Sequence, residues 1–167
     1  MKKITAFVLL VSGILIGAVL TGLLVNFSAS RMMIKEIISP YGYDKTSETL
    51  ISRINSKPGW HVVSVIDQDK EVLKYGGEKI GKVRIIQYCS GKWSSKVLAD
   101  DNRMKIAIFM PKTFAVYEKT DGRTFIALSN GAVIGKIFDA KTSDILEKVS
   151  LEVEDILQFA NFKFSLF

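Results

Sequence analysis

The sequence predicts an α+β domain preceded by one transmembrane helix. Three observations carry this prediction: an uncharged apolar run near the N-terminus, strand-like and helix-like segments in turn after it, and a clear β-hairpin pattern in the second half. We expect a single sheet, mixed or antiparallel, with helices packed mainly on one face. Residues 1–30 form the membrane segment in this interpretation, and residues 31–167 form the folded domain.

The apolar run has the length of a membrane-spanning helix. No charged residue occurs between Lys3 and Arg31, and residues 4–25 are almost entirely apolar. A helix of this length, rising about 1.5 Å per residue, matches a hydrocarbon thickness of roughly 30 Å. The apolar core of a cleaved signal peptide is shorter, roughly 7–15 residues, so the run favours an uncleaved signal anchor. Cleavage after Ser28-Ala29-Ser30, a small-residue site, is the competing interpretation.

The charges that flank this segment indicate its orientation. Lys2, Lys3 and the terminal amine precede the segment, whereas Arg31 and Lys35 follow it. A short basic tail before the first apolar helix stays in the cytoplasm by the positive-inside rule. We therefore expect a single-pass protein of the cytoplasmic membrane, with its domain on the extracytoplasmic side.

Small residues line one face of the same helix. Gly13, Gly17 and Thr21 are spaced four apart, which lets two membrane helices approach closely and predicts a homodimer. The other interpretation is that glycine is simply common in membrane helices.

Five elements fill the first half of the domain. The five are a strand over Ile34–Ser39, a helix over Lys45–Ser56, a strand over Trp60–Ile66, a short helix after Asp67 and a strand over Val83–Tyr88, and the last strand leads into a sixth element, a helix over Lys92–Leu98. Asp44 and Asp67 stand where N-caps of the first two helices are expected. Pro40, Gly59 and the Gly76-Gly77 pair interrupt the pattern between elements.

The second half contains the hairpin and a closing helix. Alternating residues in Thr113–Glu118 and Arg123–Leu128 flank the turn Lys119–Gly122. Met104–Met110 is apolar and predicts either a strand or a buried helix. A short helical segment covers residues 132–138. Thr142 is the expected cap of a last helix to about Phe159. The apolar stripe of that helix is Ile145, Val149, Val153, Ile156 and Ala160. The apolar tail 162–167 adds an edge strand, folds onto the core or touches the bilayer.

Composition excludes several classes of protein. Apolar residues make up 48% of the chain and proline is rare, which excludes a disordered chain. The net charge is +6, but acidic residues are interspersed with the basic ones, so no nucleic-acid-binding face is expected. A single cysteine excludes an intramolecular disulfide and a multi-cysteine metal site. No glycine-rich nucleotide motif or G-x-S-x-G motif occurs.

Cys89 and His61 are the side chains best suited to chemistry near neutral pH. A histidine beside the cysteine would lower the pKa of the thiol and create a nucleophile. The alternative is that Cys89 packs as a small apolar residue and that His61 is a surface or hydrogen-bonded core residue. The Ser90-Gly91 turn has backbone amides that could bind an anion, and its other interpretation is an ordinary strand-to-helix turn.

The order of these segments resembles a known family, the domains of unknown function numbered 302 (DUF302). Family members begin with a strand that ends in Ser-Pro before a capped helix, as Ser39-Pro40 does here before the Asp44 helix. A later strand leads to an Asp, similar to Asp67. A strand ending in Cys-Asn-Pro before a helix resembles Cys89-Ser90-Gly91, and a Leu-Pro-Cys step before a hairpin resembles Met110-Pro111-Lys112.

The resemblance continues to the end of the domain. An Asn-x-Gly segment is similar to Ser129-Asn130-Gly131 and the residues up to Phe138, and a closing acidic helix is similar to Ser143–Phe159. The resemblance covers roughly Met33–Asn161. It implies a compact α+β fold and a homodimer as one option, and it implies no established activity.

Two departures from the family pattern bear on function. Ser90-Gly91 stands in place of Asn-Pro, and Lys112 stands in place of the second cysteine. A two-thiol redox or metal role proposed for the family therefore cannot operate within this chain. Cys89, Ser90, Gly91 and Lys112 are the ligand-binding candidates that these matched positions define.

The sequence thus predicts a membrane-anchored, extracytoplasmic module that binds a small molecule or a protein. No assembled catalytic set is present, so we favour a protein that is not an enzyme. The alternative is a thiol-dependent redox or enzymatic role centred on Cys89, with His61 as its partner. We expect no cofactor, no metal and no nucleic acid, and we expect residues 4–25 to contact the lipid bilayer.

Overall fold

The computed structural model describes residues 2–162, apart from the side chains of residues 2–3 and 24–31. It divides into two compact units with a boundary between Met33 and Ile34. Residues 163–167 of the predicted tail 162–167 lie outside the described residues, and so do the side chains of the predicted cleavage site Ser28-Ala29-Ser30.

The first unit is one long helix, α1 (Lys2–Met33), which ends three residues after the predicted boundary at residue 30. Its segment Ile4–Leu23 has a mean hydropathy of 2.5, and none of that segment is buried by the rest of the chain. By length and composition it is able to cross a membrane. A signal sequence near the N-terminus would meet the same criteria.

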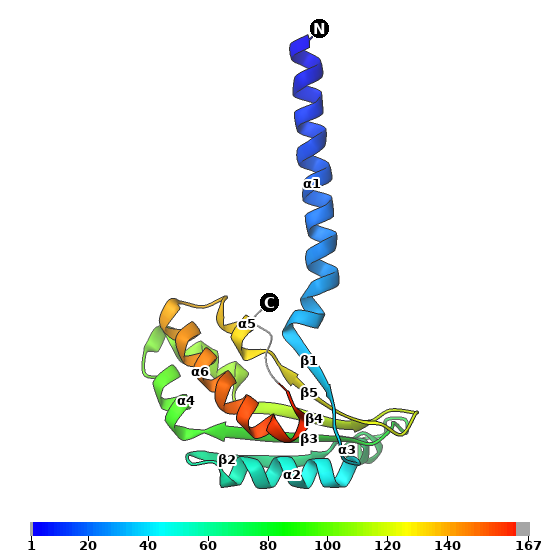
Figure 1. Cartoon of the computed structure of the whole chain (residues 1–167), viewed down its shortest axis with the longest axis vertical. Helices are drawn as coiled ribbons and strands as arrows, with labels where there is room; N and C mark the ends of the chain where they lie inside the picture. Colours follow the sequence, from blue (N-terminus) through cyan, green and yellow to red (C-terminus); the bar gives the residue numbers. More distant parts are fainter. Residues whose placement is uncertain (1, 163–167) are drawn as a thin grey trace. The chain divides into compact units, whose positions relative to one another are not determined.

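The second unit is built on one five-stranded sheet (Figure 1). Its strands are β1 (Ile34–Ile38), β2 (Trp60–Asp67), β3 (Val83–Ser90), β4 (Lys112–Glu118) and β5 (Thr124–Ser129). Their order is β1-β5-β4-β3-β2, and every neighbouring pair is antiparallel. The predicted α+β class is confirmed, and the sheet is antiparallel rather than mixed.

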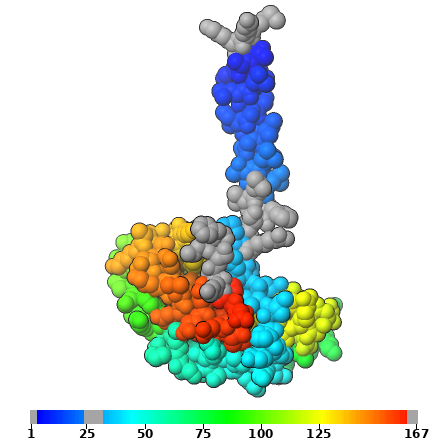
Figure 2. Space-filling model, in the orientation of Figure 1, coloured from blue at the N-terminus to red at the C-terminus, as the bar shows by residue number. Residues whose placement is uncertain are grey.

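Helices connect the strands. They are α2 (Tyr43–Ser56), α3 (Gln68–Lys74), α4 (Gly91–Val97), the 3₁₀ helix η1 (Asp101–Phe109), α5 (Gly131–Gly135), α6 (Ala140–Ile156) and the short 3₁₀ helix η2 (Leu157–Ala160). Figure 2 shows the orange-to-red surface of α6 beside the cyan and teal surface to which α2 belongs. Arg53 of α2 joins the two helices, because its Nε donates to the carbonyl oxygen of Ile156 at 2.7 Å.

The core lies between these two helices and one face of the sheet. Alternate residues of a strand point to opposite faces, and one set is fully buried here, including Ile86, Tyr88, Phe114, Val116 and Ile126. They join Leu50 and Ile54 of α2 and the α6 stripe Ile145, Val149, Val153 and Ile156 in one apolar cluster, with Ala160 and Phe162 packed against it. The predicted stripe is therefore confirmed as the buried face of α6.

The predicted hairpin is also confirmed as β4 and β5. Lys119 N–H donates to the carbonyl oxygen of Arg123 at 3.0 Å across the turn. Gly122 has φ +78°, a left-handed conformation that glycine adopts without strain.

Two of the three predicted helix caps, Asp44 and Thr142, are wrong, and the third, Asp67, stands at the predicted position without a cap hydrogen bond. The α2 helix begins earlier than predicted, with Gly42 as its N-cap, so Asp44 lies in the first turn and pairs with Arg84 instead. Asp67 occupies the N-cap position of α3, but its carboxylate makes no cap bond, because it binds Lys70 and Arg84. The cap of α6 is Asp139, which accepts a hydrogen bond from the backbone N–H of Thr142 at 3.0 Å.

The apolar segment Met104–Met110 is neither a strand nor a buried α-helix. Residues 104–109 belong to η1, and Met110 is its C-cap; the helix starts where the Asp100 carboxylate accepts a hydrogen bond from the backbone N–H of Asn102. Both edges of β4 are already paired, with β3 and β5, so the segment has no free edge of β4 to join. Only Arg103 and Ile106 of η1 are buried, and Ile108 is 83% exposed.

Candidate functional site

Strand pairing places His61 and Cys89 side by side. They face each other in the antiparallel register of β2 and β3, on the sheet face opposite to the buried Tyr88 and Ser90. His61 is exposed and Cys89 is partly exposed. The Cys89 sulfur lies 3.1 Å from the Ser94 hydroxyl, whereas no hydrogen bond joins it to His61 in the described part of the chain. The thiol–imidazole pair therefore stays a prediction.

The other predicted ligand-binding residues lie elsewhere. Cys89 is inside β3 rather than at its end, and Gly91 opens the short helix α4. Ser90 points to the core, and its hydroxyl has no hydrogen-bond partner among residues 2–162. Lys112 pairs with Tyr88 across β3 and β4, so it also points to the inner face. Cys89 thus lies on one face of the sheet, Ser90 and Lys112 point to the other, and Gly91 lies outside the sheet.

Lys112 lines an apolar pocket of about 300 Å³ between β4, η1, α5 and α6. The walls are mainly aliphatic and aromatic, and they come from Ile106, Ile108, Phe109, Met110, Ile134, Phe138 and Leu146. Phe109 and Phe138 meet edge to face with their centroids 6.1 Å apart. A concave apolar pocket with very few polar groups is the usual form of a small-molecule site. We call this the Lys112 pocket.

The electrostatics of the Lys112 pocket are unusual. No carboxylate among the described residues forms an ion pair with Lys112, and no other described side chain forms a hydrogen bond with its ammonium. Burial disfavours the charged form and lowers the pKa of Lys112 to about 8. A cation without a counter-ion in an apolar setting destabilises the folded domain. The presence of a lysine at this position is therefore not explained by stability.

Gly131 creates the space beside the ammonium. A Cβ at this position would lie 2.9 Å from Lys112 Nζ and 2.9 Å from Ser150 Oγ. Any side chain at residue 131 would therefore compete with the ammonium for the same space. The Ser150 hydroxyl donates to the carbonyl oxygen of Leu146 at 2.8 Å, which leaves its lone pairs as acceptors.

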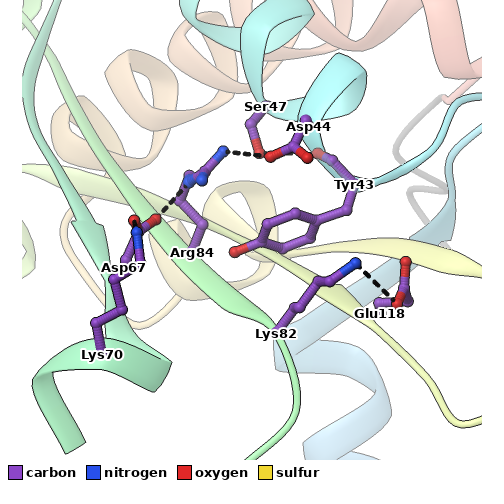
Figure 3. Close-up of polar contacts among 8 residues, drawn as sticks. All are labelled: Tyr43, Asp44, Ser47, Asp67, Lys70, Lys82, Arg84 and Glu118. Atoms are coloured by element: carbon purple, nitrogen blue, oxygen red, sulfur yellow. Dashed lines mark hydrogen bonds and ion pairs between the residues drawn. The ribbon is translucent and has the colours of Figure 1, made fainter. Parts of the chain in front are cut away.

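A second polar cluster connects α2 with the end of β2 and the start of β3 (Figure 3). Arg84 Nε donates to Asp67 at 2.7 Å, and Arg84 Nη1 lies 3.3 Å from Asp44. Lys70 binds the other oxygen of Asp67 at 2.5 Å. The Arg84 guanidinium also lies 4.9 Å from the centre of the Tyr43 ring, a cation–π contact.

This cluster is a structural network rather than a catalytic one. Hydrogen bonds from Lys70 and Arg84 lower the pKa of Asp67, so the carboxylate stays ionised at neutral pH. Burial raises the pKa of Tyr43 to about 12, so its phenol stays protonated. Neither group exchanges a proton near neutral pH, which general acid–base catalysis requires. Among the described residues, no three histidine, cysteine, aspartate or glutamate side chains gather to hold a metal ion.

Comparison with known proteins assigns the domain. The model of the family described as domain of unknown function DUF302 matches residues 35–160. The chain belongs to the DUF302 family. A search of curated proteins found no match.

A solved DUF302 structure has the same fold. It is the crystal structure of an uncharacterised conserved DUF302 protein from Bacillus stearothermophilus, with 18% sequence identity and a TM-score of 0.68. The match covers 77% of this chain and 98% of the relative, and at this identity it shows the fold alone. Because nearly all of the relative is matched, we expect residues 34–167 of this DUF302 chain to fold without α1.

Sequence reasoning found Lys112 but not its environment. The family resemblance singled out the position, because a cysteine stands there in other members. The alternation of β4 offered a second signal: residue 112 shares a face with Phe114 and Val116, which are fully buried. The residues of η1 and α5 that complete the pocket gave no such signal, because neither segment has a clear period.

The shifted pKa of Lys112 predicts a specific dependence of stability on pH. The unfolded chain holds this proton up to its ordinary pKa of 10.5, whereas the folded domain releases it at about 8. The free energy of unfolding should therefore rise between pH 8 and 10.5 through this residue. Lys112→Met should be more stable than wild type at pH 7, by up to roughly 3 kcal/mol, and the difference should shrink by pH 10.

Urea unfolding of residues 34–167 at several pH values measures this difference. All other titrating groups are common to the two proteins, so they cancel in the comparison. A difference that stays constant from pH 7 to 10 would show that the ammonium is not desolvated.

Proposed function

We propose that this protein is a membrane-anchored binding module whose domain holds a small amphipathic acid in the Lys112 pocket. In this proposal α1 stays in the cytoplasmic membrane and the domain lies on its extracytoplasmic side. The observation that carries the proposal is the Lys112 ammonium, which has no ion-pair partner among the described residues and lies within apolar walls.

The charge of Lys112 indicates the polar end of the ligand. A carboxylate next to Nζ would supply the counter-ion that the described residues do not provide, and it would favour the charged lysine. The Ser150 hydroxyl borders the same space beside Gly131, but its proton is donated to the Leu146 carbonyl, so Lys112 is the group that would bind the carboxylate. Binding an acid therefore offsets the free-energy cost of the desolvated Lys112 ammonium in the free domain.

The walls of the pocket indicate the other end of the ligand. Ile108 and Phe109 line the pocket while 83% and 49% of their surfaces remain exposed. Exposed apolar side chains around a pocket commonly mark the place where an apolar ligand enters. A volume of about 300 Å³ is at the small end for ligand sites, so we expect a short aliphatic or aromatic body.

The thiol-dependent role remains the second candidate function. The observation that favours it is the direct cross-strand pairing of His61 with Cys89. The sulfur has Ser94 as its nearest polar partner, however, and this hydrogen bond does not require the histidine. We therefore rank ligand binding first.

Calorimetric titration with octanoate, octanol and octylamine tests the proposed ligand class. These probes share one apolar chain and differ in charge. Residues 34–167 should bind octanoate about tenfold or more tightly than octanol at pH 7, and octylamine least, because only the carboxylate pairs with Lys112. Lys112→Met should remove the preference for octanoate over octanol.

Two glycine variants supply a matched comparison. Gly131→Ala should weaken octanoate binding, because its Cβ takes the space beside Nζ. Gly42→Ala adds the same methyl group where nothing lies within 4 Å, and it should bind like wild type. Equal affinity for all three probes, or unchanged octanoate binding in Lys112→Met, would exclude the proposed ligand class.

Membrane anchoring is tested separately with the full chain in bacterial cells. The intact protein should remain with the membranes after extraction with alkaline carbonate, because α1 spans the bilayer. Replacing Leu15 and Ala18 with lysine should release it, since charges at the centre of a membrane helix are costly. Lysine at Leu73 and Ile80, two exposed positions of the domain, is the matched control. Recovery of a shortened chain that begins after Ser30 would contradict the anchor and identify a signal peptide.

A further inference from the structure

A second recess, away from the walls of the Lys112 pocket, gathers positive charge. It has a volume of about 360 Å³ and opens between α4, η1 and α6. Lys96, Arg103, Lys141 and Lys148 line it, and we call it the basic recess. Figure 2 shows the orange surface of α6 next to the green surface to which α4 belongs.

The basic recess has an excess of cations. Among the described residues that line it, Asp144 is the one carboxylate, and it pairs with Lys148 at 2.7 Å. Lys96 and Lys141 are exposed and form no ion pair in the described part of the chain. The Lys96 ammonium lies 4.9 Å from the centre of the Trp93 ring, and this cation–π contact holds the ammonium beside the recess that Trp93 lines.

Arg103 supplies the observation that points to a ligand. Its side chain is only 7% exposed, and its Nη1 is buried with no hydrogen-bond partner among residues 2–162. The charge of Arg103 acts on Asp139, whose carboxylate already accepts hydrogen bonds from Thr142. Those hydrogen bonds and, to a smaller extent, the charge of Arg103 lower the pKa of Asp139. A guanidinium is always charged, so its burial without an acceptor is costly unless an anion binds nearby.

We propose that the basic recess binds a phosphate-type oxyanion, with Arg103 at its base and Lys96 and Lys141 at its rim. Arginine holds tetrahedral oxyanions through its planar fork of donors, and lysine adds point charges around them. The apolar wall formed by Trp93 and Ile145 leaves room for a small organic substituent. The same chemistry is offered by a soluble phosphoester, by free phosphate and by the headgroup of an anionic phospholipid.

Binding is measured with the full chain in a non-ionic, phosphate-free detergent by isothermal titration. The probes are inorganic phosphate, glycerol 3-phosphate and water-soluble dihexanoylphosphatidylglycerol, at constant ionic strength. We expect at least one probe to saturate. Saturation by the first two identifies a soluble phosphate ligand, and saturation by the lipid alone identifies a headgroup site.

Three variants make the test specific to the basic recess. Lys96→Gln with Lys141→Gln changes only exposed residues and should weaken binding about tenfold or more, as should Arg103→Met. Lys79→Gln with Lys136→Gln removes the same charge elsewhere and should bind like wild type. Lys112→Met should also keep full affinity, which separates this site from the Lys112 pocket. The proposal is overturned when no probe saturates, or when the Lys96 and Lys141 variant binds as wild type does.

Discussion

The inner face of β4 is the feature on which the rest of the structure depends. Phe114 and Val116 are fully buried there against the helical layer, and Lys112 precedes them on the same face. The period of a strand leaves no choice in this placement, since a shift of one residue would expose Phe114 and Val116 together. The apolar core thus determines that a lysine points inward at the start of the strand.

The surroundings of Lys112 turn this placement into a pocket. At the start of β4 the short segments η1 and α5 join α6 around Lys112. Gly131 has no side chain to fill the space next to Nζ, and no acidic residue among those described compensates the charge. By contrast, Arg84 at the other side of the domain is satisfied by Asp67 and Asp44. The two cations show the difference between a structural ion pair and a cation with no counter-ion among the described residues.

Much of the fold followed from sequence periodicity. The β4–β5 hairpin and the α6 stripe were predictable because their apolar positions repeat at the period of the element. The caps were not, because an aspartate near a helix start can equally bind a cation from a distant strand, as Asp44 binds Arg84. The 3₁₀ helix η1 was missed for a different reason. Its apolar composition predicted a buried segment, but its apolar residues are mostly exposed.

The candidate sites were less predictable than the fold. Lys112 could be named from its matched position, and Cys89 with His61 from their chemistry, but no local pattern shows that a lysine lacks a counter-ion. Arg103 gave no signal at all, because its burial depends on the packing of η1 next to α4 and α6. Such features arise from contacts between segments that are distant in the sequence.

The most direct measurement is the titration of the Lys112 side chain itself by NMR, with Lys112→Met to assign its signal. A midpoint near pH 8 in the free domain, which moves upward when octanoate is added, is the predicted result. A midpoint near the ordinary value of 10.5 in the free domain would contradict the central claim, because the ammonium would then be solvated or paired.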